Sequence, residues 1–114
     1  MTRHTTHIDP GLDPVLMPLV HAADEQLEAI LGDISGRVTA TWMPGTPDAD
    51  LAPTATLELN DAEVTRSQEF TRRELAESTH LRYDLRRLML DVLADRIRIH
   101  RRRLLESMAA GDGD

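Results

Sequence analysis

Cysteine is absent from this sequence, and all thirteen of its basic residues are arginine, so lysine is absent as well. Without cysteine the chain forms no disulfide bond and offers no thiolate as a nucleophile or metal ligand. A small secreted domain often needs disulfides, so we expect a reducing compartment and a cytoplasmic location. No stretch approaches the roughly 18 apolar residues that span a bilayer, and the first residues lack the apolar core of a signal peptide.

Aromatic residues are almost as scarce, since Trp42, Phe70 and Tyr83 are the only three. Three scattered aromatics do not form a platform on which nucleic-acid bases stack. The sequence also lacks the glycine-rich motifs that bind phosphates and the glycine-flanked serine of hydrolases. We therefore expect a non-enzymatic protein without a cofactor.

The charge is unevenly distributed along the chain. The net charge is −7, but residues 1–61 hold two arginines and ten acids, whereas residues 62–106 hold eleven arginines and eight acids. Arginine is suited to forked contacts with carboxylates or phosphates. The arginine-rich half is therefore a candidate binding region, although an acidic protein repels phosphates over most of its surface.

A first helix is predicted over residues 14–31. Apolar residues recur there at helical spacing, at Leu16, Val20, Ala23, Leu27 and Ile30. The opposite face carries His21, Asp24, Glu25 and Glu28. This pattern is typical of an amphipathic helix whose charged face lies in solvent, and Gly32 is a plausible stop.

Strands are predicted after this helix. Residues 37–42 and 54–59 alternate between apolar and polar side chains, and the three prolines between positions 44 and 53 indicate a long hairpin loop. Residues 64–70 alternate poorly and are expected to form an uncertain third strand at the sheet edge. Residues 1–13 are polar, contain Pro10 and Gly11, and are expected to be a flexible leader.

A long helix is predicted at the end of the chain. Thr71 and Glu74 have the spacing of a capping box, Ser78 and Thr79 are expected to interrupt the helix, and apolar residues then recur until about residue 106. Three strands of about six residues are about 20 Å long, whereas 25 helical residues run for about 37 Å. The helix therefore has more apolar surface than the sheet can cover, and a second copy is the simplest way to cover the rest.

These elements predict an α+β fold with a helix, a three-stranded antiparallel sheet and a long C-terminal helix. The single domain is expected over residues 14–108, with a disordered tail over 109–114. The order of elements is shared by double-stranded-RNA-binding domains. The resemblance is one of topology, because the first helix, which touches RNA in that family, carries Asp24, Glu25 and Glu28 here.

Metal binding is not expected. Glu77 and His80 have the i, i+3 spacing used by di-iron bundles, with Asp84 one turn further, but that class requires two such motifs and the sequence has one. His4, His7 and Asp9 are assigned to the leader. Asp91 and Asp95 are expected to form exposed ion pairs with Arg87 and Arg98 on the long helix.

The long helix is therefore the candidate functional element. We expect a protein–protein interaction or assembly module that self-associates through this helix, its partner being a second copy or another protein. The partner-binding residues predicted are Leu88, Val92, Arg96, Ile99, Arg101, Arg102 and Arg103. The alternative is nucleic-acid binding through the same arginines.

Overall fold

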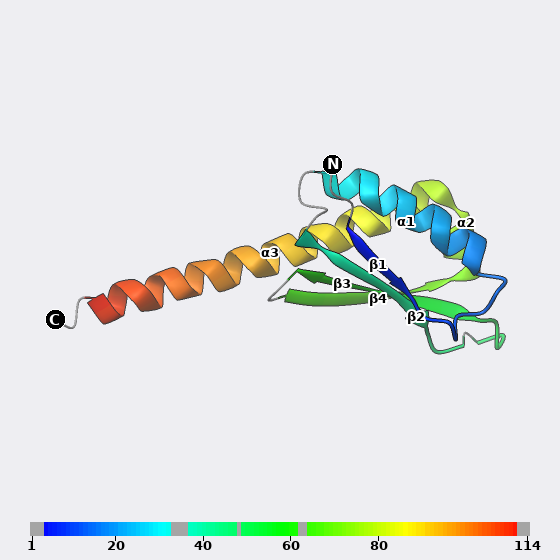
Figure 1. The fold of residues 1–114 in the computed structure, drawn as a ribbon, viewed down its shortest axis with the longest axis horizontal. Helices are drawn as coiled ribbons and strands as arrows, with labels where there is room; N and C mark the ends of the chain where they lie inside the picture. Colours follow the sequence, from blue (N-terminus) through cyan, green and yellow to red (C-terminus); the bar gives the residue numbers. More distant parts are fainter. Residues whose placement is uncertain (1–3, 33–36, 48, 62–63, 112–114) are drawn as a thin grey trace.

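The computed structural model describes residues 4–32, 37–47, 49–61 and 64–111. In this part of the chain the helices lie on one face of a four-stranded sheet, and the last helix runs far beyond the sheet (Figure 1). The elements in chain order are β1 (Thr5–Ile8), α1 (Met17–Leu31), β2 (Thr39–Pro44), β3 (Thr54–Asp61), β4 (Val64–Thr71), α2 (Arg72–Ala76) and α3 (Ser78–Gly111). The molecule is elongated, measuring 61 × 34 × 26 Å.

The central hairpin forms as the alternating sequence predicts. β2 and β3 pair antiparallel, with Trp42 opposite Leu57. β4 pairs antiparallel with β3 and lies at the sheet edge, which confirms the weakest of the predicted strands. Trp42 and Phe70 are fully buried, with ring centroids 6.2 Å apart. The apolar face of the sheet therefore forms one side of the hydrophobic core.

The prediction of a three-stranded antiparallel sheet is wrong, because the sheet has four strands and is mixed. β1 pairs parallel with β2 at the opposite edge from β4. It comes from the stretch expected to be a flexible leader, and Leu12 beyond it is also buried. The strand escapes prediction because it is four residues long and only one of its two inward residues, Ile8, is apolar, the other being Thr6.

The resemblance to double-stranded-RNA-binding domains ends here. The chain begins with a strand that pairs parallel with β2, and α1 connects the two. A helix followed by three antiparallel strands and a second helix is therefore not the order of elements in this fold. The first helix also contacts this additional strand, through the hydrogen bond from Thr6 to Asp24.

The helix ends follow local sequence rules. Gly32 follows α1 with φ +52°, a left-handed conformation that glycine adopts without a Cβ penalty. Thr71 and Glu74 form the predicted capping box, in which the Thr71 hydroxyl accepts from the Glu74 amide at 3.2 Å. The helix is interrupted as predicted, but at Glu77, between α2 and α3, whereas Ser78 and Thr79 are the first residues of α3.

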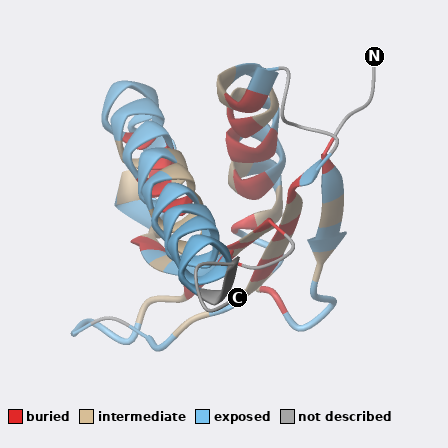
Figure 2. Cartoon of the chain, turned by 90° about the vertical axis from the view of Figure 1, so that its left-hand side faces the viewer, coloured by how far each residue is buried: buried red, intermediate tan, exposed pale blue. Residues whose placement is uncertain are grey.

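Helix α3 is longer than predicted and continues to Gly111. Residues 109–111, expected to be disordered, are helical, and residues 112–114 lie outside the described residues. Figure 2 shows the buried residues gathered between the helices and the sheet, while the end of α3 is exposed. The molecule thus consists of a packed body and a projecting helix.

Candidate protein-interaction surface

The first half of α3 belongs to the core. Leu81, Leu85, Leu88 and Val92 recur at spacings of four, three and four residues, and each is at most 3 % exposed. They form one helical face that packs on the body. Two of the predicted partner-binding residues, Leu88 and Val92, are therefore inside the protein rather than on the surface that a partner can reach.

A second apolar stripe runs along another face of α3, and we call it the seam. Its members are Tyr83, Leu90, Ile97 and Leu104, with exposed fractions of 66 %, 55 %, 67 % and 55 %. They are spaced seven residues apart, which is nearly two helical turns, so they follow a single face. Met108 extends this face by one further turn and is 59 % exposed.

The two stripes correct the single broad stripe that the sequence indicates. At 100° per residue, the buried set and the seam lie on different sides of the helix. The buried set stops at Val92, apart from the half-buried Ile99, and the seam continues past it. The surplus of apolar surface is thus real, but it lies at Ile97 and Leu104 and not at the residues predicted to bind.

A surface recess adjoins the seam where α3 leaves the body. It has a volume of about 380 Å³ and is lined by Arg37, Leu93, Arg96, Ile97 and His100. Its apolar residues, Leu93 and Ile97, come from α3, whereas Arg37 comes from the segment that leads into β2. The recess is therefore lined by two apolar side chains, two arginines and a histidine.

The remaining predicted binding residues divide into three environments. Arg96 donates to the buried Asp61 at 2.8 Å, so it joins α3 to the end of β3. Ile99 is half-buried and lines a recess with Val64. The last three are fully at the surface of the projecting half: Arg101, Arg102 and Arg103.

The ion pairs of Asp95 were predicted only in part. Arg98 donates to Asp95 at 3.1 Å, as the helical spacing indicates, but Arg66 of β4 also donates to it, at 2.5 and 3.0 Å. The hydrogen bond from Arg66 lowers the pKa of Asp95 and, in turn, raises the pKa of Arg66. This contact fastens α3 to the edge strand at the point where the helix departs.

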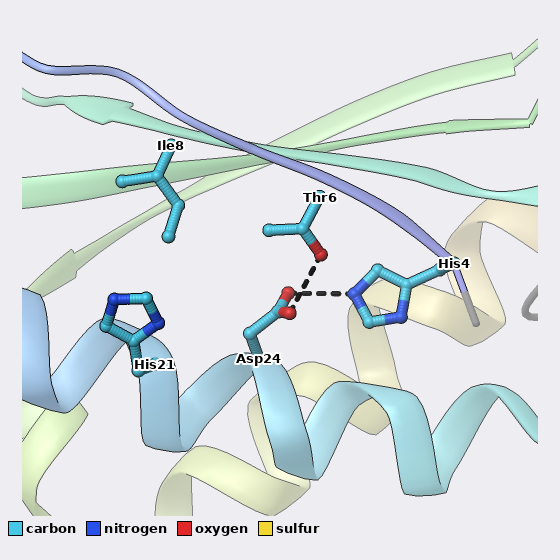
Figure 3. Close-up of a pocket in the computed structure, with 5 residues that line it drawn as sticks. All are labelled: His4, Thr6, Ile8, His21 and Asp24. Atoms are coloured by element: carbon cyan, nitrogen blue, oxygen red, sulfur yellow. Dashed lines mark hydrogen bonds and ion pairs between the residues drawn. The ribbon is translucent and has the colours of Figure 1, made fainter.

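A polar cluster lies between β1 and α1 (Figure 3). The fully buried His4 ring contacts Asp24 through Nε2 at 2.8 Å and Glu28 through Nδ1. Asp24 also accepts from Thr6 at 2.8 Å and from the Trp42 indole at 3.3 Å. The prediction that Asp24 lies in solvent is therefore wrong, since it is 6 % exposed.

This cluster is built to hold β1 on α1. Both ring nitrogens of His4 face carboxylate oxygens, so neither is left to bind a metal ion or to take a proton from a substrate. An open pocket beside it is lined by His4, Thr6, Ile8, His21 and Asp24, and Figure 3 shows the His21 ring turned toward Ile8. The geometry indicates a structural role.

Glu77 and His80, which have the spacing of a di-iron motif, lie 4.0 Å apart on exposed helix surface. Within the described residues, no three or more histidine, aspartate or glutamate side chains converge in a way that suits a metal ion.

The same part of the chain contains no helix with the length and apolar character needed to cross a bilayer. Comparisons with protein-family models, curated proteins and solved structures found no match.

Proposed function

We propose that this protein is a non-enzymatic protein–protein interaction module, and that a helix of another chain binds along the seam of α3. The observation that carries the proposal is the series Tyr83, Leu90, Ile97 and Leu104, each more than half exposed on a helix that projects from the body. Single exposed apolar residues are common, but an apolar series with heptad spacing is typical of helix pairing.

The energetics of the projecting half support the same proposal. A helix without tertiary packing is only marginally stable in water, because most helical stability in proteins comes from burial of an apolar face. The outer half of α3 has such a face, and its own body does not cover it. A second helix laid along the seam would bury these side chains and stabilise the helix that carries them.

Site-specific crosslinking in the producing cell tests this proposal. A photoreactive amino acid at Leu104 is expected to give a discrete adduct with a protein partner, because this residue belongs to the seam. Leu105 is the matched control, since it is the neighbouring residue, is 59 % exposed and points to another side of the helix. Equal adducts at both positions, or none at Leu104, would contradict the proposal.

Nucleic-acid binding is the second candidate, and it depends on the exposed Arg101, Arg102 and Arg103. Phosphate contacts would make the affinity for duplex DNA or RNA fall steeply with salt. The apolar seam between the arginines is unfavourable for that role, because it would face a charged backbone. Filter binding at low salt separates the two candidates: the interaction module gives no salt-sensitive retention of duplex.

A further inference from the structure

The charges beside the seam carry information about the binding partner. Leu93 lies four residues before Ile97 and lines the recess beside it, so we place Leu93 at heptad position d and the seam at position a. In a helix paired in this way, the flanking positions e and g lie next to the partner. Between residues 82 and 108, all of which the structure describes, every charged residue at these flanking positions is an arginine. These are Arg82, Arg87, Arg96, Arg101 and Arg103.

The acids of α3 avoid the same surface. Asp84 and Asp91 occupy position b, Asp95 occupies position f, and Glu106 occupies position c. Asp95 is turned toward Arg66 of β4, on the side of the body. Arginines also occur on the other faces, with Arg86 at position d, Arg98 at b and Arg102 at f, but no acid of α3 between residues 82 and 108 lies at e or g.

The presence of arginines alone at the charged e and g positions disfavours a second copy as the partner. In a parallel pair of helices position g of one lies beside position e of the other, and in an antiparallel pair e lies beside e and g beside g. Either arrangement of two α3 helices sets arginine against arginine. Like charges at these positions select against a pairing, so the charges oppose the self-association expected from the sequence.

The recess beside the seam has the same chemistry. Arg37, Arg96 and His100 line it together with Leu93 and Ile97, so an apolar side chain entering the recess would lie beside two arginines. Arg96 also contacts Asp61, which fixes one side of the recess in place. A partner suited to this surface presents apolar side chains next to carboxylates.

Resting on the proposed function, we infer that the seam binds an acidic amphipathic helix of a different protein. The partner helix has apolar residues on the face that meets Leu90, Ile97 and Leu104, and glutamates or aspartates on both flanks. Charge complementarity sets the choice of partner, and burial of the seam supplies the attraction. Arg87 and Arg101 are the flanking arginines best placed to read these acids, because both are exposed and lie away from the body.

Binding of three synthetic helices of about four heptads tests this inference. All have leucine at positions a and d, and they carry glutamate, glutamine or lysine at e and g. Measured by fluorescence anisotropy, the glutamate helix is expected to bind the full chain at least about tenfold more tightly than the lysine helix. The double variant Arg87→Glu/Arg101→Glu is expected to reverse this order.

The control variant is Arg73→Glu/Arg102→Glu, which changes the net charge equally but leaves the flanks intact, and it is expected to keep the wild-type order. Equal binding of the glutamate and lysine helices, or identical behaviour of the two variants, would overturn the acidic partner while leaving the interaction module standing. A dimer of the chain alone that Leu104→Glu dissociates and Leu105→Glu does not would have the same consequence. If none of the three helices binds, both proposals fail.

Discussion

The two halves of α3 share the exposed seam, but only the inner half also has a face of fully buried apolar residues. In the half that crosses the sheet, Leu85 and Leu88 are buried on the inner side, and Tyr83 and Leu90 of the seam are exposed on the outer side. In the projecting half the apolar residues Ile97 and Leu104 are on the outer side, and polar residues continue the inner one. The buried face thus ends at Val92, whereas the exposed seam continues along the helix. The inner half stabilises the fold, and the outer half is available for contact with another molecule.

The largest expected difference between the halves is in stability. Leu85→Ala leaves a cavity in the core and is expected to lower the free energy of unfolding by about 2–5 kcal/mol. Leu104→Ala removes the same atoms from an exposed position and is expected to change it by less than about 0.5 kcal/mol. Urea unfolding followed by circular dichroism measures both. Similar losses for the two variants would mean that the outer half packs against its own body.

A smaller loss is expected where the N-terminal segment is fastened to the body. Asp24→Asn keeps the size of the side chain but sets an amide where His4, Thr6 and Trp42 direct their donors. A buried donor left unsatisfied costs about 1–3 kcal/mol. Glu25→Gln, at an exposed position on the same helix, is the control and is expected to be neutral in the same urea titration. If the two variants had the same free energy of unfolding, the cluster would not be what holds β1 on the body.

The smallest effect is expected at the border between the halves and depends on pH. The hydrogen bond from Arg66 lowers the pKa of Asp95 below its ordinary value of 3.8. The carboxylate of Asp95 therefore binds a proton more weakly in the folded state than in the unfolded state. The contact stabilises the folded protein at pH values above the ordinary pKa of this group. That stabilisation is lost as the pH falls through the lower pKa of the folded state. The melting temperatures of the wild type and Asp95→Asn should therefore converge between about pH 6 and pH 2, and a constant gap would contradict the assignment.

The regular elements were predictable because their signals are local. The hairpin of β2 and β3, the edge position of β4, the stop at Gly32 and the capping box at Thr71 follow from alternation and from single-residue preferences. The alternation in β4 is poor, yet pairing with β3 is enough to form the strand.

Other features depend on partners distant in the sequence and were missed. The failures to predict strand β1 and the burial of Asp24 have one cause, because the hydrogen-bond partners of the Asp24 carboxylate include His4 and Thr6 from the segment that forms this strand. Periodicity alone also merged two faces of α3 into one stripe. Burial of Leu88 and Val92 separates them, and burial depends on where the body ends along the helix.

The projecting part of α3 also sets a distance. A helix advances about 1.5 Å per residue and turns about 100° with each one, so in the proposed complex the residue number would set how far from the body the partner binds and which way it faces. Inserting seven residues after the contact of Arg96 with Asp61 would move Leu104 outward by about 10 Å with nearly the same orientation. Inserting two would turn it through more than half a revolution. In the proposed complex the helix would therefore be a spacer whose phase is as important as its length.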